Sequence, residues 1–219
     1  MLPLALVALV LFLAASVGEA RDEDADLVAA AARGDLESVR RLVGRGVDVD
    51  SRDAQGRTAV TAAVYANGLD VVQALIEAGA DIDIQDDMRA NALLATGETG
   101  NVEILRAVLG AGPDLKRTNR FGGTALIPAA HRGHVEVVRE LVGTAIDVDH
   151  VNDPGWTALL EAVILGDGGP AHQEIVRILV DAGADPRIAD TGGVTALEHA
   201  RRSGYTEIVQ ILSRHDTTG

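Results

Sequence analysis

The stretch Asn119-Arg-Phe-Gly-Gly-Thr-Ala-Leu126 and the later Gly133-His-Val-Glu-Val-Val-Arg-Glu-Leu-Val142 decide the fold of this chain. Gly122 suits a turn that needs positive φ. The Thr124 hydroxyl can cap a helix of about two turns that ends near Gly133. The Ile146-Asp-Val-Asp149 run alternates apolar and acidic residues and predicts an exposed extended segment. Between the first helix and this segment, a second helix is expected from about Val135. Its apolar face consists of Val137, Val138, Leu141 and Val142.

The same pattern recurs at a fixed spacing of 33 residues, as from Asn91 to Thr124. Recurrence at such a period indicates an array of stacked units. Because one unit cannot bury its own apolar face, its neighbours must complete the core. The counterparts of Thr124-Ala-Leu126 are Thr58-Ala-Val60, Asn91-Ala-Leu93, Thr157-Ala-Leu159 and Thr195-Ala-Leu197, and those of Gly133-His134 begin at Gly34, Asn67, Gly100 and Gly204.

This pattern resembles the ankyrin repeat, whose consensus contains Thr-Pro-Leu-His-x-Ala, Gly-His-x-Glu-Ile-Val and Gly-Ala-Asp-Val-Asn. The matching stretches include Thr124-Ala-Leu126, Gly133-His134, Gly79-Ala-Asp-Ile-Asp83 and Gly183-Ala-Asp185, and the resemblance covers about residues 24–215. It implies an all-α solenoid of about six helix–turn–helix units with β-turn or hairpin tips. The chain departs from the consensus by an alanine in place of the proline, by Ala145 in place of a helix-ending glycine, and by Thr61, Leu94, Ile127, Leu160 and Glu198 at the histidine position.

The fifth unit differs in length from the others. The distance from Glu136 to Glu174 is 38 residues, which places five extra residues between the helices of this unit, near Gly166–Pro170. Glycine and proline indicate a surface loop, which is either a tolerated insertion or a functional element. The predicted divisions are a signal peptide at 1–20, units at about 21–53, 54–86, 87–119, 120–152, 153–190 and 191–215, and a frayed tail at 216–219.

Composition limits the classes of function. The 219 residues are 47% hydrophobic but only 2% aromatic, so small apolar residues must form the core. The formal net charge of −14 disfavours binding to nucleic acid and favours a basic protein surface or cations. Together with the resemblance, which implies a protein-binding module, this makes another protein the expected partner, and the chain is expected to be a monomer.

The N-terminal residues predict export. Leu2–Ala15 is an apolar run too short for a comfortable transmembrane helix, and Gly18-Glu-Ala20 offers small residues for a signal peptidase. An uncleaved anchor and an incorrectly assigned start are the alternatives. After cleavage no stable membrane insertion is expected, and the absence of cysteine suits a periplasmic or secreted protein without disulfides.

Catalysis has little support in the sequence. There is no cysteine, no Gly-x-Ser-x-Gly motif, and no lysine with a serine or threonine after Gly166–Gly169 to form a phosphate-binding loop. His134 occupies a family position that implies a structural role. His131, His150 and His172 lack a second ligand at zinc-like spacing. We therefore expect no catalytic residues, metal ligands or cofactor, and an enzyme of unrecognised type remains the alternative.

Acidic pairs recur at one position of the repeat. Asp48-Val-Asp50, Asp81-Ile-Asp83 and Asp147-Val-Asp149 would stack into a row at roughly 10 Å per unit, the thickness of a helix layer. Calcium needs six to eight oxygens at one centre, which such a spacing does not supply. Lys116 and Arg187 interrupt the row. Solvated charge is the simpler interpretation, and a weakly calcium-binding surface the alternative.

Protein binding is the best-supported function. In ankyrin repeats, partners commonly lie against the turn tips and the inner face of the first helices. Three of the four aromatic residues beyond position 20 fall there, and aromatic and arginine side chains often dominate binding energy. Each could instead pack on its neighbouring turn. The predicted partner-binding residues are Arg57, Tyr65, Met88, Arg120, Phe121, His131, Arg132, Trp156, Ile164 and Leu165, with Phe121, Trp156 and Met88 forming an apolar track.

Overall fold

The computed structural model describes residues 26–216 of the chain. The predicted signal peptide lies outside these residues, as does the end of the predicted tail. Residues 26–32 are helical. They are followed by α2 (Leu36–Gly44), α3 (Ala59–Tyr65), α4 (Leu69–Glu77), α5 (Ala92–Thr99), α6 (Val102–Gly110), α7 (Leu126–His131), α8 (Val135–Val142), α9 (Ala158–Ile164), α10 (Pro170–Asp181), α11 (Ala196–Ser203) and α12 (Thr206–Asp216).

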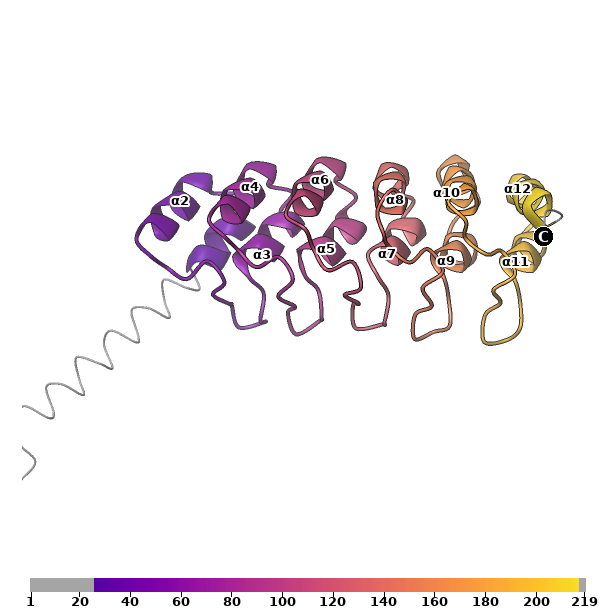
Figure 1. The fold of residues 1–219 in the computed structure, drawn as a ribbon, viewed down its shortest axis with the longest axis horizontal. Helices are drawn as coiled ribbons and strands as arrows, with labels where there is room; N and C mark the ends of the chain where they lie inside the picture. The colour runs from indigo at the N-terminus through magenta and orange to yellow at the C-terminus, as the bar shows by residue number, and fades with distance from the viewer. Residues whose placement is uncertain (1–25, 217–219) are drawn as a thin grey trace, which may run out of the picture.

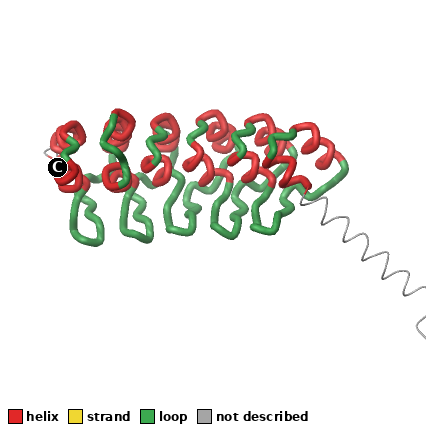
Figure 2. Tube along the Cα trace, turned by 180° about the vertical axis from the view of Figure 1, so that it is seen from behind, coloured by secondary structure: helices red, strands yellow, loops and turns green. Residues whose placement is uncertain are grey.

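The helices form two layers that run the length of an elongated array (Figure 1). The first helices of successive units contact one another in the order α3, α5, α7, α9, α11, and the second helices do so from α2 to α12. The loops between units all project to one side (Figure 2). We call them the tip loops; they are residues 45–58, 78–91, 111–125, 143–157 and 182–195. The predicted solenoid is confirmed.

The tip loops contain very little β structure. Within residues 26–216 there is no strand, and the hairpin character of the tips is limited to isolated antiparallel bridges, Arg52 with Thr58 and Ala189 with Thr195. The segment Ile146–Asp149 is not extended as predicted, because Val148 and Asp149 form a turn and Ile146 is 6% exposed. Its apolar positions anchor the loop to the helices instead of alternating along a strand.

Side-chain caps set the start of most first helices. Thr58, Asn91, Thr157 and Thr195 each accept a hydrogen bond from the backbone N–H three residues later. These bonds satisfy N–H groups that have no partner within the helix. A threonine or asparagine followed by alanine therefore acts as the helix start signal in these four units.

The fourth unit is the exception, and the prediction that Thr124 caps its first helix is wrong. The α7 N-cap is Ala125 without a side-chain hydrogen bond, and the buried Thr124 hydroxyl has no hydrogen-bond partner. Pro128 explains this, because it has no N–H to donate to the Thr124 carbonyl and disfavours a helical Ile127. The Ile127 N–H donates to the Thr124 carbonyl instead, at 3.2 Å, and this bond tightens the first turn.

The core is continuous from end to end and is made mainly of alanine, valine and leucine. Leu126 is 1% exposed, between the first helices of adjacent units. In α8 the residues Val137, Val138 and Leu141 are buried as predicted, while Val142 is half-buried. Small side chains allow helices of neighbouring units to approach closely, which is why a chain with few aromatics still forms a dense core.

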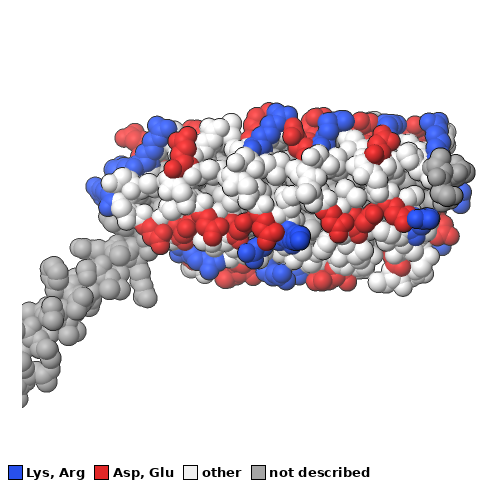
Figure 3. Space-filling view, viewed as in Figure 1, with Lys and Arg blue, Asp and Glu red and all other residues white. Residues whose placement is uncertain are grey.

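One row of hydrogen bonds between units uses the acidic pairs. The side chain of the second aspartate in a pair accepts a hydrogen bond from a backbone N–H of the following unit, at the position of the first aspartate. Asp50 accepts from Asp81 at 2.8 Å, Asp83 from Asp114 at 3.0 Å, and Asp149 from Asp185 at 2.9 Å. We call the row the acidic edge (Figure 3); its residues are Asp48, Asp50, Asp81, Asp83, Asp114, Asp147, Asp149 and Asp185.

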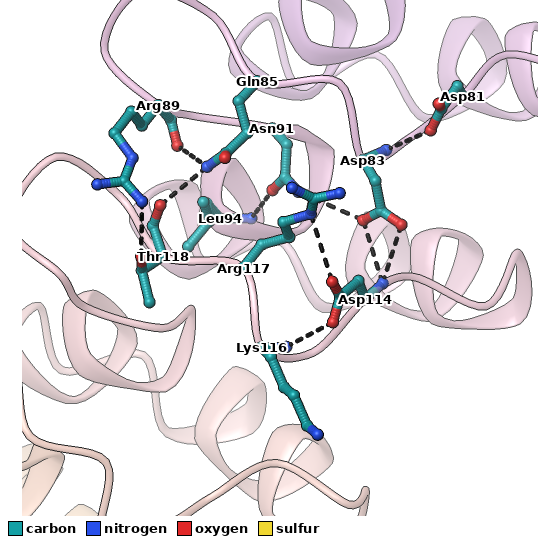
Figure 4. A network of polar contacts seen from close by, with 10 residues as sticks. All are labelled: Asp81, Asp83, Gln85, Arg89, Asn91, Leu94, Asp114, Lys116, Arg117 and Thr118. Atoms are coloured by element: carbon teal, nitrogen blue, oxygen red, sulfur yellow. Dashed lines mark hydrogen bonds and ion pairs between the residues drawn. The ribbon is translucent and has the colours of Figure 1, made fainter.

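The close-up in Figure 4 shows how units two and three are joined. The two Asp83 oxygens lie 3.1 and 3.0 Å from the Asp114 amide nitrogen, and the Asp114 side chain accepts from the Lys116 N–H and pairs with Arg117. Nearer the tips, the Gln85 amide donates to the Thr118 carbonyl at 2.8 Å. Adjacent tip loops are thus held to one another by recurring aspartates and, between units two and three, also by Gln85, whose equivalents are Arg52 and Thr118.

The inserted loop of the fifth unit is tied to both neighbouring units. His172 Nε2 lies 2.9 Å from the His131 carbonyl, and its Nδ1 lies 2.8 Å from Asp167 Oδ1. On the other side, the Tyr205 hydroxyl donates to the Gly166 carbonyl at 3.0 Å. The contact of His172 with the preceding unit repeats that of His134, whose Nε2 lies 3.1 Å from the Glu98 carbonyl. His134 and His172 therefore have structural positions.

The last helix is longer than predicted. α12 continues to Asp216, the first residue of the predicted frayed tail, so Asp216 is helical. His215 Nε2 lies 3.7 Å from an Asp181 side-chain oxygen on α10, a contact that links the end of the array to the preceding unit.

Candidate functional site

Two adjoining grooves lie between the tip loops and the first helices. The larger groove has a volume of about 480 Å³ and the smaller groove about 270 Å³. They share Glu98, Asn119, Phe121 and Arg132, so they form one continuous surface across units two to five. This is the inner face where the sequence predicted a partner.

The larger groove brings together six of the predicted residues, which come from three successive units. Its apolar part is exposed, at 39% for Tyr65, 48% for Met88 and 52% for Phe121. Single exposed hydrophobic residues are ordinary on protein surfaces, but a contiguous group in a groove indicates an interaction site. The six residues are Arg57, Tyr65, Met88, Arg120, Phe121 and Arg132.

Arg120 fixes the arrangement of the apolar residues. Its guanidinium carbon lies 4.6 Å from the centroid of the Phe121 ring, and its Nη1 lies 3.5 Å from Met88 Sδ. Stacking on the ring keeps the guanidinium in place while leaving donors free for a ligand. The exposed Phe121 and Met88 side chains are therefore held by Arg120 without being buried.

The other end of the larger groove holds charged and hydroxyl groups. Arg57 pairs with Asp53 at 2.8 Å, so its head group is oriented. Burial, together with the negative charges of Glu98 and Asp86, raises the pKa of Tyr65 to about 12. The Tyr65 phenol is therefore neutral at physiological pH, and its hydroxyl interacts with the Glu98 side chain.

The smaller groove contains a buried carboxylate that the sequence analysis missed. Glu161 is 8% exposed, and its Oε1 accepts from Asn152 Nδ2 at 2.8 Å. Asn152 is fixed in turn, because its Oδ1 accepts from the Trp156 N–H at 2.8 Å. Glu161 Oε2 lies 3.7 Å from Nδ1 of His131. The carboxylate is thus held from one side, with its other oxygen close to a partly exposed imidazole.

Burial controls the charges in the smaller groove. It raises the pKa of Glu161 to about 7, against the opposing effect of the Asn152 hydrogen bond. Burial also lowers the pKa of His131, and the positive charges of Arg132 and His172 lower it further. At neutral pH the His131 ring is therefore uncharged, and Glu161 exchanges its proton near that pH.

The structure divides the predicted residues into two groups. The six listed above line the larger groove, and Phe121, His131, Arg132 and Leu165 line the smaller one, with Leu165 44% exposed. Trp156 and Ile164 line neither groove, because both are partly buried against the hydrophobic core. The predicted track that joins Phe121 to Trp156 does not form. Trp156 instead contributes its backbone N–H to the Asn152 turn.

A signal for Glu161 was present in the sequence. Its equivalents in units two, three, four and six are Ala62, Ala95, Pro128 and His199, so a carboxylate is unique there. In unit six the positions of Asn152 and Glu161 are occupied by Asp190 and His199. The Oδ2 of Asp190 and the Nε2 of His199 are 2.7 Å apart. Comparing each repeat position across units would have singled out both pairs.

Two further features bear on function. Among residues 26–216, no three histidine or acidic side chains converge in a way that could hold a metal ion. In the same range, every helix is too short or too polar to cross a bilayer.

Known proteins similar to this chain are ankyrin repeat proteins. A family model described as ankyrin repeats (3 copies) matches residues 7–86 and 92–190. The putative ankyrin repeat protein YahD of Escherichia coli strain K12 is 48% identical over 52 residues, which are 24% of this chain and 26% of that protein. The match therefore spans about a quarter of that relative.

Solved structures agree along most of the chain. The ankyrin repeat domain of a protein from Acinetobacter baumannii AYE is 47% identical with a TM-score of 0.83, over 87% of this chain and 97% of that one. The ankyrin repeat protein EF0377 is 41% identical with a TM-score of 0.82, over 86% and 96%. The chain belongs to the ankyrin repeat family, whose members are protein–protein interaction modules on a generally non-enzymatic fold.

Proposed function

We propose that this chain is an exported, non-catalytic binding module that holds another protein in its larger groove. The observation that carries the proposal is the group of exposed Met88 and Phe121 with Arg120 stacked between them. Aromatic and arginine side chains at the centre of a contiguous groove are the usual sites of large binding energy. The groove is also pre-organised, which lowers the entropic cost of binding.

The proposed partner has a basic surface and binds to a monomer of this protein. The formal net charge of −14 would attract such a partner and accelerate its association, most strongly at low salt. Scaffolding, inhibition and protection of the partner are all compatible with a surface that binds without reacting.

Export to the periplasm or the extracellular space is part of the proposal. It rests on the apolar run Leu2–Ala15 and on a chain free of cysteine. N-terminal sequencing of the purified protein tests it, with Arg21 expected as the first residue. An intact Met1 or Leu2 on a cytosolic product would contradict export.

Affinity capture with a matched control tests the binding site. The wild-type chain should recover a partner from the envelope or secreted fraction, and the Met88→Ala, Phe121→Ala double variant should recover little of it. Val151→Ala is the control, because Val151 is 47% exposed but lines neither groove. Equal recovery by all three proteins would place the site elsewhere, with the inserted loop as the next candidate.

A further inference from the structure

The smaller groove contains a buried carboxylate, that of Glu161, for which the described residues supply no lysine or arginine partner. Glu161 is 8% exposed, and such burial is costly for a carboxylate unless a cation accompanies it. Its Oε1 receives one neutral hydrogen bond, from the Asn152 amide at 2.8 Å. Within the described residues, the basic atom within 4 Å of Oε2 is His131 Nδ1 at 3.7 Å, which is too long for a hydrogen bond.

The other charged and titratable groups around the smaller groove do not supply the Glu161 carboxylate with a cation in the described residues. From α7 and its C-cap come His131, whose pKa is lowered, and Arg132, which lies at the boundary of both grooves. From α5 comes Glu98, a second acid in the same groove. On the far side of His131, His172 is held by Asp167 and by a backbone carbonyl. Glu161 thus lines the groove, and among the described residues no lysine or arginine nitrogen lies within 4 Å of its carboxylate.

The rest of the groove suits an alkyl chain. Phe121 and Leu165 are 52% and 44% exposed, and the buried Ile127 also lines the groove. Apolar lining together with a buried carboxylate in one groove matches a side chain with a methylene stem and a cationic head. Neither a carboxylate nor a simple apolar side chain fits both features.

We propose that the smaller groove binds a lysine or arginine side chain of the partner protein, with the cationic head at Glu161 Oε2 and the stem against Phe121, Ile127 and Leu165. This inference rests on the proposed protein-binding function and assigns a specific position to the basic residue of the partner. The incoming N–H groups supply the hydrogen bonds and the counter-charge that Oε2 lacks, and the carboxylate is ionised when the cation is bound.

A small-molecule titration tests this site independently of any partner. The probe is n-butylguanidinium, titrated into the full chain at pH 8 and followed by NMR of the Glu161 carboxyl carbon and the Leu165 and Ile127 methyl groups. Saturable shifts at these three residues are expected. Valerate and 1-pentanol, which have similar chains but a negative or no charge, should bind at least about tenfold more weakly, since a hydrogen bond between charged groups contributes that much. Pentanol binding as tightly as butylguanidinium would overturn the proposal.

Matched variants separate the carboxylate from general charge. Glu161→Gln keeps the shape and the acceptor for Asn152, and it should weaken butylguanidinium binding by about tenfold or more. Glu136→Gln removes the same charge from an exposed position on α8, in the other helix layer, and should leave binding unchanged. Unchanged binding by Glu161→Gln, or equal loss in both variants, would contradict the proposal.

The wild-type protein provides a test that does not depend on the folding of a variant. Butylguanidinium should bind at pH 8 and lose affinity at pH 5, because protonation of Glu161 removes its charge. Affinity that does not change with pH would argue against the site. If a captured partner binds Glu161→Gln normally but not the Phe121 variants, this inference fails while the proposed function stands.

Discussion

The acidic edge and the inner grooves are two surfaces of one array, and they use side chains in opposite ways. On the acidic edge the carboxylates of Asp50, Asp83 and Asp149 are occupied by backbone N–H groups of other units. In the grooves, Phe121 is 52% exposed, and Oε2 of Glu161 lacks a cation within the described part of the chain. The most visible charge pattern of the protein is thus structural, and the less regular surface offers free binding groups.

The difference follows from repetition. A side chain that recurs at every unit finds the same neighbour at every step, so it becomes part of the contact between units. A side chain present once, such as Glu161 among Ala62, Ala95, Pro128 and His199, has no such recurring partner. In a repeat protein, residues that break the pattern are therefore better candidates for function than residues that follow it.

The largest expected effect belongs to the repeated core. Leu126→Ala removes a side chain that is 1% exposed between two units, and should lower the free energy of unfolding by roughly 2–4 kcal/mol. Urea denaturation measures the change. A loss below about 0.5 kcal/mol would mean that the core position is not as filled as the structure shows.

Glu161 should respond to pH in the opposite sense to a typical carboxylate. Burial raises its pKa from 4.5 to about 7, so the folded protein is penalised for ionising it. Its contribution to stability is therefore fully present below pH 4.5 and is lost as the pH rises to about 7. Glu161→Gln should match wild type in acid and be more stable at pH 8 by about 1–3 kcal/mol, allowing for screening at the groove mouth.

Urea denaturation of both proteins at pH 4.5 and pH 8 checks this. The Glu136→Gln variant, with its exposed carboxylate, should show no such divergence from wild type. Equal stability of wild type and Glu161→Gln at pH 8 would mean that Glu161 is not destabilised by burial.

The acidic edge should show a smaller effect of purely structural origin. Asp83→Ala removes the acceptor of the Asp114 N–H and should cost about 1–2 kcal/mol, since the amide loses a hydrogen bond to a charged group. Thermal and urea denaturation measure it. Addition of calcium should leave the stability of the wild-type protein unchanged, and clear stabilisation by calcium would reassign the edge as a metal site.

The smallest effect is expected where the acidic edge is interrupted. Lys116 stands at the repeat position of Asp50 and Asp83, and a lysine has no acceptor for the Asp147 N–H of the next unit. Lys116→Asp should add this bond and stabilise the protein by about 0.5–1 kcal/mol at moderate salt. A decrease in stability at all salt concentrations would show that charge repulsion outweighs the added bond.

The sequence predicted the repeated part of the structure well and the unique part incompletely. The solenoid, the helix pairs and the inner face follow from residues that recur, so six copies reinforce each prediction. Thr124 failed as a cap because Pro128, present at that position in one unit, removes an N–H and shifts the first turn. Such a local competition is not visible in a consensus.

Burial explains the remaining differences in the site. Trp156 was expected on the surface by register, but it is half-buried against the core, next to the turn that holds Asn152. Glu161 was overlooked because acidic residues are abundant and are usually solvated. Which of many carboxylates is buried depends on the neighbouring unit, and that is a tertiary property.

The central claim is that exposed, non-repeated side chains bind the partner while repeated ones hold the array together. Phe121→Ala and Asp83→Ala test it most directly when the free energies of unfolding and of partner binding are both measured for each. Phe121→Ala should weaken binding by about 2 kcal/mol or more and change stability by less than about 0.5 kcal/mol. Asp83→Ala should show the reverse, with lower stability and unchanged affinity. Normal binding by a Phe121→Ala protein that unfolds more easily would contradict the account.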